Sequence, residues 1–104
     1  MEDKKYDVRF LPLFEEDLFS IVTYIAERLK NPAAANKLID DVESAIMKRS
    51  SYAESFEPYH SAKERKYPYY RIYVGSYVIY YVVIDDVMEV RRILYNKRNV
   101  KDKL

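Results

Sequence analysis

The sequence predicts an α+β domain in which an αα-hairpin packs on one face of a largely antiparallel four-stranded sheet. Three observations support this fold. Residues 69–84 have the pattern of a β-hairpin, residues 12–49 contain two consecutive amphipathic helical patterns, and strand-like segments lie before and after these elements. The predicted order is therefore β, α, α, β, β, β. Because 104 residues support one hydrophobic core, we treat residues 1–104 as a single domain.

A proline separates the first strand from the first helix. Residues 6–11 alternate between apolar and polar positions, which puts Tyr6, Val8 and Phe10 on one face of a strand. Pro12 ends this strand and suits the first position of a helix, where its missing N–H costs nothing. The helix that follows has apolar residues at spacings of three and four: Phe14, Leu18, Ile21, Val22, Ile25 and Leu29. The sequence does not determine where the first strand joins the sheet.

A second helix begins directly after the first. Asn31 suits the N-cap position and Pro32 the first helical position. The apolar stripe of this helix comprises Ala35, Leu38, Ile39, Val42 and Ile46. Because almost no residues separate the two helices, they must form an antiparallel hairpin whose two stripes face the sheet.

Residues 50–68 lack both helical and strand periodicity, so we expect a long loop. Such loops in compact domains tend to be functional or mobile. His60 lies in this loop and is a candidate general base, although a single histidine among polar residues is more often incidental. The loop ends in Lys63, Arg65 and Lys66, directly before the hairpin.

The predicted hairpin turns at Gly75 and Ser76. A glycine at the first central position indicates a type II′ turn, because that position needs a positive φ. In the resulting register Val74 faces Tyr77, and Arg71 faces Tyr80. One face of the hairpin then carries Ile72, Val74, Tyr77, Ile79 and Val83, and the other carries Tyr69, Arg71, Tyr73, Val78 and Tyr80. The first face suits the core, and the second is either a binding surface or a half-exposed layer of tyrosines.

Residues 87–95 form the last predicted strand. Alternation puts Met88, Val90 and Leu94 in the core, with Arg92 among them near the edge of the core. The opposite face then carries Glu89, Arg91, Ile93 and Tyr95. Residues 96–104 have no periodicity, so we expect this segment to be dispensable for the fold. The face of the sheet away from the helices is expected to be open.

Basic residues are concentrated at the end of the chain. Residues 91–104 contain six basic residues and only one acidic residue, Asp102, whereas the rest of the chain is net acidic. This distribution suggests a polyanion or an acidic protein surface as partner, although a solvated terminus is the alternative.

Composition excludes several kinds of site. The chain has no cysteine and one histidine, so disulfides, thiolate metal sites and histidine-rich zinc sites are excluded, and we expect no metal and no cofactor. No apolar run approaches the ~20 residues of a membrane-spanning helix, and no signal peptide is evident. We therefore expect a cytoplasmic protein that does not bind membranes.

Several short motifs follow one another in a fixed order. They are the Pro12-started helix with Asp17-Leu18, then Asn31-Pro32, Tyr70-Arg71, Val74-Gly75-Ser76-Tyr77, Tyr80-Tyr81, and Arg92-Ile93-Leu94-Tyr95 with Lys97-Arg98. This ordered set resembles the RelE/ParE superfamily of toxins from bacterial type II toxin–antitoxin modules, often called plasmid stabilisation proteins. The resemblance spans nearly the whole chain and implies a cognate antitoxin as partner.

The resemblance implies one of two activities. RelE-like members cut messenger RNA on the ribosome with basic residues, and Arg71, Tyr80, Tyr95 and Arg98 are the candidate catalytic residues for such an endoribonuclease. ParE-like members bind DNA gyrase. The chain departs from the RNase branch at Val78 and Tyr73, where that branch often has basic residues, and no tyrosine follows Arg98. The segment 76–81 is more similar to the ParE branch, which would make the protein a gyrase inhibitor rather than an enzyme.

The candidate residues for binding a partner or target are Arg71, Tyr73, Arg91, Tyr95, Lys97, Arg98 and Lys101. Three hypotheses remain open. The protein is a gyrase-binding toxin, a ribosome-dependent mRNA endoribonuclease, or a degenerate toxin that retains only antitoxin binding. The sequence also leaves a homodimer open.

Overall fold

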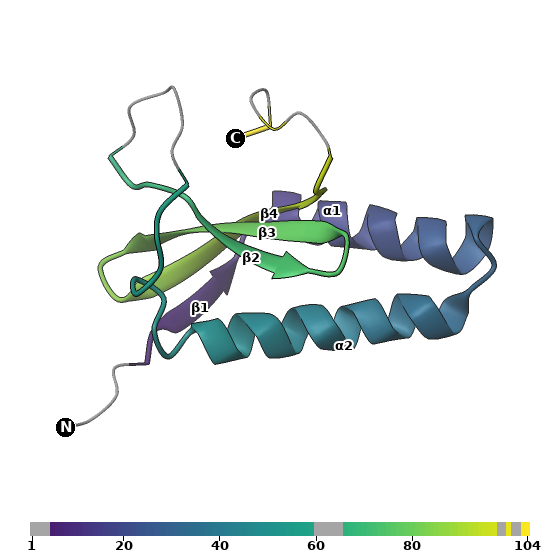
Figure 1. The fold of residues 1–104 in the computed structure, drawn as a ribbon, viewed down its shortest axis with the longest axis horizontal. Helices are drawn as coiled ribbons and strands as arrows, with labels where there is room; N and C mark the ends of the chain where they lie inside the picture. The colour runs from purple at the N-terminus through teal and green to yellow at the C-terminus, as the bar shows by residue number, and fades with distance from the viewer. Residues whose placement is uncertain (1–4, 60–65, 98–99, 101–102) are drawn as a thin grey trace.

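The computed structural model describes residues 5–59, 66–97, 100 and 103–104, and it contains the predicted elements in the predicted order (Figure 1). The strands are β1 (Asp7–Phe10), β2 (Tyr70–Val74), β3 (Tyr77–Ile84) and β4 (Val87–Tyr95). The helices are α1 (Pro12–Thr23), a π-helical turn η1 (Tyr24–Arg28) that continues α1, and α2 (Pro32–Arg49).

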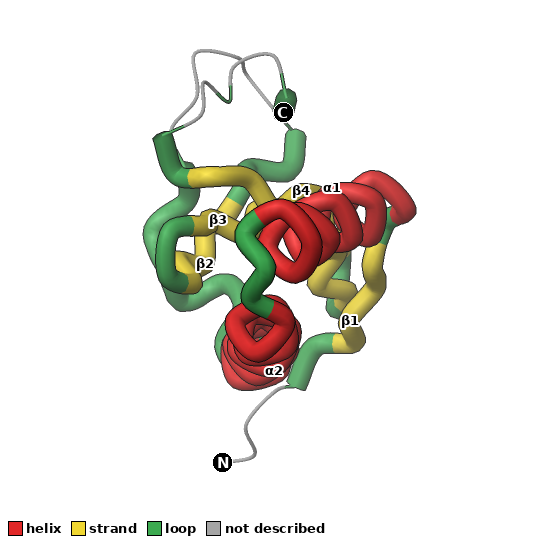
Figure 2. The backbone as a smooth tube through the Cα atoms, turned by 90° about the vertical axis from the view of Figure 1, so that its right-hand side faces the viewer, coloured by secondary structure: helices red, strands yellow, loops and turns green. Residues whose placement is uncertain are grey.

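The sheet has the strand order β1-β4-β3-β2, so the first strand joins the last one. β1 pairs with β4 in parallel, with Val8 opposite Met88, whereas the other two pairings are antiparallel. Figure 2 shows both helices on one side of the sheet and the C-terminal end on the other. The sheet position of β1, which the sequence left undetermined, is therefore an edge.

The predicted register of the β2–β3 hairpin is confirmed. Val74 pairs with Tyr77 and Arg71 with Tyr80. Gly75 has φ +56°, while Ser76 is not among the described residues with positive φ, as a type II′ turn requires. A Cβ added at Gly75 would meet no atom within 4 Å, so the turn requires glycine for its backbone conformation and not for space.

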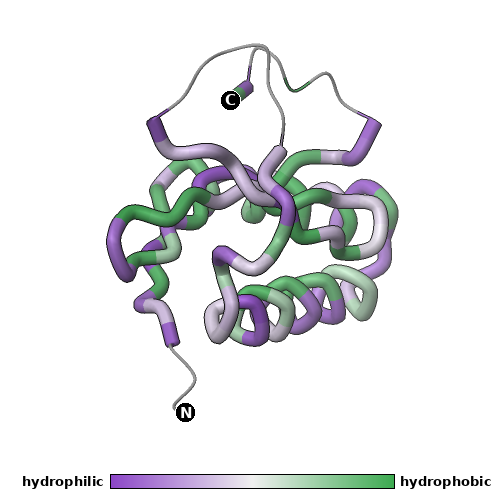
Figure 3. The backbone as a smooth tube through the Cα atoms, turned by 60° about the vertical axis from the view of Figure 1, so that its left-hand side comes forward, coloured by the Kyte–Doolittle hydropathy of each residue, from purple (hydrophilic) through white to green (hydrophobic). Residues whose placement is uncertain are grey.

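Both helices present their predicted apolar stripes to the sheet. Phe14 of α1 and Val42 and Ile46 of α2 are buried against it, and the alternation of polar and apolar turns along α2 is visible in Figure 3. The Asn31 side chain accepts a hydrogen bond from the Ala34 N–H, which confirms the predicted N-cap. The first stripe ends earlier than predicted, because Leu29 is exposed beyond the π-helical turn.

Strand β4 contains a β-bulge. Tyr80 pairs with Arg92 but Tyr81 pairs with Val90, so Arg91 has no partner on β3. A bulge of this kind inserts one residue into a strand and shifts the alternation of all side chains beyond it. Nothing in the sequence of β4 marks this position.

The bulge reverses the predicted side-chain positions from Arg92 onward, and Arg92, predicted on the core side, lies opposite Tyr80 of the other face. Ile93 packs in the core on the helix side, and Leu94 packs on the opposite face. Tyr95 follows Ile93 to the helix side, where its ring lies edge-on to that of Tyr77 with 5.9 Å between centroids. The predictions for Ile93, Leu94 and Tyr95 were therefore wrong, whereas those for Met88 and Val90, before the bulge, are confirmed.

The face of the sheet away from the helices is not open as predicted. It carries a second buried cluster formed by Tyr69, Val78, Tyr80, Val82 and Leu94. Tyr59 and Tyr67 of the long loop, Ile84 at the end of β3, and Val100 and Leu104 of the C-terminal segment pack against this cluster. Val100 and Leu104 thus bury apolar surface, although the segment 96–104 was not expected to contribute to a core; that this segment is dispensable for the fold stays a prediction.

Asp17 joins α1 to the edge of β4. Its carboxylate accepts two hydrogen bonds from Arg92, Nε to Oδ2 at 2.7 Å and Nη2 to Oδ1 at 2.8 Å, and one from the Ile93 N–H at 3.2 Å. Arg92 Nη1 also donates to the Lys103 carbonyl at 3.1 Å. The hydrogen bonds that Arg92 donates to Asp17 raise the pKa of Arg92. A single half-buried carboxylate thus connects a helix, a strand edge and the C-terminal segment.

We expect Asp17→Asn to lower the free energy of unfolding by about 1–3 kcal/mol, because Arg92 and the Ile93 N–H would lose a charged acceptor in a place that water reaches poorly. Urea denaturation of the purified protein measures this change. Glu15→Gln, at an exposed position of α1 two residues before Asp17, is the matched control and should change stability by less than about 0.5 kcal/mol. Equal losses in the two variants would contradict a structural role for Asp17.

Candidate partner-binding surface

The face of the sheet away from the helices carries arginines and tyrosines in contact with one another. We call it the aromatic–cationic surface and define it by Tyr59, Arg71, Tyr73, Tyr80 and Arg91. Strand alternation in β2 puts Arg71 and Tyr73 on this face, and the register puts Tyr80 of β3 opposite Arg71. The bulge in β4 directs Arg91 to the same face.

Arg71 lies between aromatic rings. Its guanidinium carbon is 4.8 Å from the ring centre of Tyr59 and 5.8 Å from that of Tyr73. Both distances fall within the range of cation–π interactions, which hold a cation on a surface without neutralising it. Arg71 is therefore oriented by its neighbours and still carries a full positive charge toward solvent.

Tyr80 lies opposite Arg71 in the β2–β3 hairpin and is buried. The rings of Tyr59 and Tyr69 meet it edge-on, with 6.1 and 6.3 Å between centroids. Burial raises the pKa of Tyr80, with Tyr59 adding to the rise and Arg71 opposing it. The Tyr80 hydroxyl therefore stays protonated at neutral pH and is suited to donating a hydrogen bond rather than to accepting a proton.

Arg91 is held by a buried carboxylate. Its Nε donates to Glu89 Oε1 at 2.8 Å, and Nη1 lies 3.5 Å from the Tyr69 hydroxyl. Arg9 of β1 approaches the other oxygen of Glu89 at 3.7 Å. Burial alone would lower the pKa of Arg91, but its hydrogen bonds to Tyr69 and Glu89 raise it overall. Two arginines from different strands thus share one carboxylate and leave net positive charge on this face.

The structure separates the remaining predicted site residues. Tyr95 lies on the helix side of the sheet, away from Arg71 and Tyr80, because of the bulge. Lys97 is exposed in the turn after β4. Arg98, Lys101 and His60 lie outside the described residues. Of the four residues implied for an endoribonuclease, the described structure brings together Arg71 and Tyr80 only.

Sequence reasoning missed two features of this site. Glu89 was placed on the right face, but its role as a shared partner of Arg9 and Arg91 was not predicted, because the pairing of β1 with β4 was unknown. Tyr59 contacts Arg71 from the long loop, and its N–H donates to the Tyr69 carbonyl at 2.6 Å. Tyr59 is one of four aromatic residues in the loop, with Tyr52, Phe56 and Tyr67, and the sequence does not distinguish it from the other three.

The helix side has an apolar hollow between α1 and α2. Glu15, Leu18, Phe19, Val22 and Ile39 line a volume of about 300 Å³. The Phe19 side chain is 73% exposed, which is unusual for a phenylalanine. This hollow is the second surface of the described structure that is suited to binding another protein.

The described residues contain no group of three or more histidine, cysteine, aspartate or glutamate side chains arranged to hold a metal ion. Among the helices in the described part of the chain, none has the length and apolar character to cross a membrane.

A family model described as the ParE toxin of the type II toxin–antitoxin system, parDE, matches residues 8–100. A search of curated proteins finds no match. Among solved structures, a chain of the chromosomal ParDE toxin–antitoxin system from P. aeruginosa is 14% identical with a TM-score of 0.71, and the match covers 88% of this chain and 97% of that one.

Two archaeal structures are also similar. A chain of the RelE–RelB complex from Pyrococcus horikoshii OT3 is 18% identical with a TM-score of 0.54, covering 91% of this chain and 99% of that one. A chain of the RelB–RelE antitoxin–toxin complex from Methanococcus jannaschii is 25% identical with a TM-score of 0.46, covering 86% and 91%. The first of these archaeal chains and the P. aeruginosa chain support the fold described above.

The raised pKa of Tyr80 predicts how stability depends on pH. The unfolded chain loses its tyrosine protons near pH ~10, whereas buried Tyr80 keeps its proton to higher pH, so the folded state binds more protons and stability falls as pH rises above about 10. Tyr80→Phe should make this fall less steep. Urea denaturation between pH 8 and pH 11 measures it, with Tyr73→Phe as a control for loss of a hydroxyl from the same face. An unchanged slope in Tyr80→Phe would contradict burial of the phenol.

Proposed function

Since the chain belongs to the family of ParE toxins of type II toxin–antitoxin systems, we propose that it arrests growth by binding DNA gyrase and is neutralised by a cognate antitoxin. The match over residues 8–100 is the observation that carries this proposal. We further propose that Arg71, Tyr73 and Arg91 of the aromatic–cationic surface contact the target. Lys97, Arg98 and Lys101 follow β4 and would add positive charge to the same interaction. A cytoplasmic location is part of the proposal, because gyrase acts there.

The contacts of Arg71 support binding over catalysis. Its guanidinium lies between Tyr59 and Tyr73, where it is suited to holding an acidic or planar group of a partner. Val78, at a position where the RNase branch has a basic residue, is buried and apolar. A transition state with developing negative charge would lack that donor, and the loss of one such donor typically lowers a rate by ~10²- to 10³-fold.

One observation favours the endoribonuclease as a second candidate function. Arg71 pairs with Tyr80 across the hairpin, so a phosphate ligand and a protonated hydroxyl lie side by side. With Tyr95 on the other side of the sheet, such an enzyme would need a residue other than Tyr95 beside this pair. A degenerate toxin that binds only the antitoxin is the third candidate.

We propose that the antitoxin covers the apolar hollow between α1 and α2. Leu18, Phe19 and Ile39 offer anchoring positions for one face of an amphipathic helix. Strand β2 is at the edge of the sheet, so an added strand is a further means of contact. The hollow contains no residue of β2, whereas Arg71 belongs to that strand, so substitutions in the hollow test antitoxin binding separately from the target contacts of Arg71.

We expect Arg71→Ala to abolish or strongly reduce growth arrest while changing stability by less than about 1 kcal/mol, because the contacts of Arg71 with described residues are cation–π contacts to Tyr59 and the exposed Tyr73. Growth after induced expression measures arrest. Lys48→Ala removes the same charge from an exposed position on α2 and is the matched control.

Supercoiling by purified gyrase and primer extension on ribosome-bound messenger RNA then identify the target. Inhibition of gyrase supports our proposal, codon-position cleavage supports the endoribonuclease, and arrest by neither route contradicts both.

We expect Phe19→Ser to weaken binding of the antitoxin encoded by a neighbouring gene by roughly tenfold or more, since an exposed aromatic anchor typically contributes more than 1 kcal/mol. Calorimetry with the purified antitoxin measures this loss, and growth arrest by the variant alone should persist. Unchanged affinity would show that the antitoxin binds elsewhere.

A further inference from the structure

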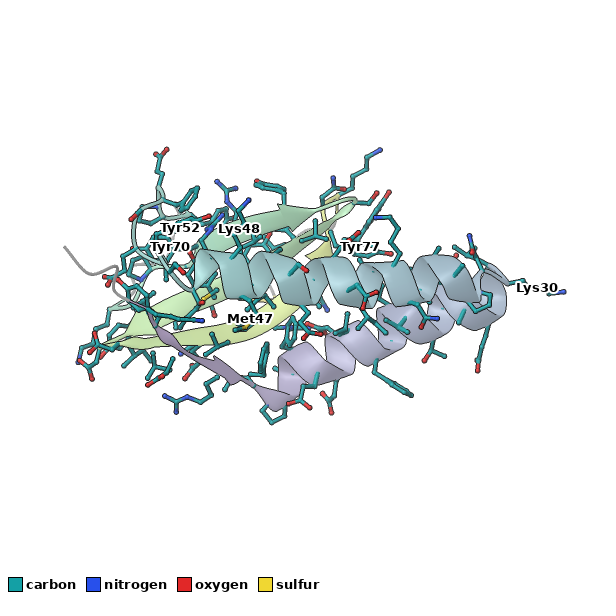
Figure 4. All side chains as sticks on the ribbon, turned by 90° about the horizontal axis from the view of Figure 1, so that it is seen from below. Lys30, Met47, Lys48, Tyr52, Tyr70 and Tyr77 are labelled. Atoms are coloured by element: carbon teal, nitrogen blue, oxygen red, sulfur yellow. The ribbon has the colours of Figure 1, made fainter. Side chains whose placement is uncertain are left out.

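A second aromatic site lies on the helix side of the sheet, apart from the aromatic–cationic surface. Tyr24, Tyr77 and Tyr95, with Ser20 and Ile21, line an open cavity of about 550 Å³, a volume typical of small-ligand sites. We call it the tyrosine pocket. The three tyrosines come from η1, the start of β3 and the end of β4. Figure 4, drawn from the helix side, shows Tyr77 beside α2 at the end of the sheet nearer Lys30.

Two irregular features of the backbone lie at the pocket. The bulge in β4 turns Tyr95 to this side, where it meets Tyr77 edge-on. At Tyr24 the helix widens into a π-helical turn, in which the Leu29 N–H donates to the Tyr24 carbonyl at 3.1 Å. Both β-bulges and π-helical turns are enriched next to functional sites. Without the bulge, Tyr95 would lie on the other face of the sheet.

The hydroxyls of the pocket have acceptor capacity to spare. Within the described part of the chain, no hydrogen bond joins the hydroxyl groups of Ser20, Tyr24, Tyr77 or Tyr95 to another protein group. Tyr24 and Tyr95 are 51% and 45% exposed, so their rings are accessible from solvent. Burial raises the pKa of Tyr77, and the nearby Tyr95 and Tyr24 hydroxyls add to the rise, so the Tyr77 phenol is neutral at physiological pH. The pocket therefore presents uncharged rings and oxygen lone pairs.

These groups favour a cationic ligand. The lining contains no basic side chain that could pair with an anion. An apolar ligand would remove water from the four hydroxyl groups without replacing its hydrogen bonds. Glu16, Glu27 and Arg28 lie on the helical segment within about one turn of the lining residues, so the acidic residues there outnumber the basic one; Lys97 lies two residues beyond Tyr95. Rings of tyrosine attract cations through their faces, and a planar guanidinium also donates hydrogen bonds to hydroxyl oxygens.

We propose that the tyrosine pocket binds an arginine side chain of a partner protein. The guanidinium stacks against the exposed rings of Tyr24 and Tyr95 and donates to the hydroxyls around it. The proposal does not depend on which target the toxin binds, because the pocket and the aromatic–cationic surface share no residue.

The test compares three blocked peptides that differ at one side chain: acetyl-Gly-Arg-Gly-amide, its citrulline analogue and its leucine analogue. Citrulline keeps the shape and hydrogen-bonding groups of arginine but is neutral. Ring resonances of the tyrosines, followed by NMR during titration, report binding. We expect the arginine peptide to shift Tyr24, Tyr77 and Tyr95 with a dissociation constant on the order of millimolar, and the citrulline peptide to bind several-fold more weakly.

Variants then assign the effect to the pocket. Tyr24→Leu and Tyr95→Leu should each weaken arginine binding roughly two- to fivefold, whereas Tyr24→Phe should retain most of it, because the ring supplies the attraction. Tyr52→Leu, at an exposed tyrosine outside the pocket, is the control. Tyr77 is left intact because it packs against the core, and thermal unfolding verifies each variant. Equal binding of arginine and citrulline, tighter binding of leucine, or no ring shifts at any soluble peptide concentration would overturn the proposal.

Discussion

The extra residue in β4 is the constraint on which the arrangement of both faces depends. Up to Val90 this strand presents its apolar side chains to the helices in simple alternation, and beyond Arg91 the alternation is reversed. The reversal gives Ile93 to the core and Leu94 to the cluster on the opposite face. It also leaves Arg92 at the strand edge within reach of Asp17. Without the bulge, the alternation would have put the Arg92 guanidinium, together with Leu94, on the face that the helices cover.

Strand β3 shows why both faces of this sheet need cover. Six consecutive residues, from Val78 to Val83, are buried, so this strand is packed on its two sides like the central strand of a layered fold. Two helices cover one side. The other is covered by side chains from the long loop and by Val100 and Leu104, which come from segments without regular structure. The aromatic–cationic surface is therefore a polar rim around a small second core rather than a bare sheet.

Local features of this fold were predictable from sequence and non-local features were not. Gly75 and the alternation around it determine the hairpin register, and Asn31-Pro32 determines the start of α2, because each signal lies within a few residues of its effect. The parallel pairing of β1 with β4 joins segments about 80 residues apart and leaves no local mark. The bulge at Arg91 was not predictable, because β4 contains no glycine that would indicate it. Of the candidate site, Arg71 opposite Tyr80 was predictable from register alone, whereas the place of Tyr95 depended on the bulge.

The pairing of the first strand with the last has a consequence for biosynthesis. The helical hairpin can form as soon as residues 12–49 leave the ribosome, because its contacts are sequential. The sheet cannot close until β4 has emerged, since β4 lies between β1 and β3 and both depend on it for pairing. Until that moment the nascent chain has no assembled aromatic–cationic surface, and its non-local topology slows the final step. An antitoxin that recognises the helices would meet its site on the growing chain before the sheet is complete.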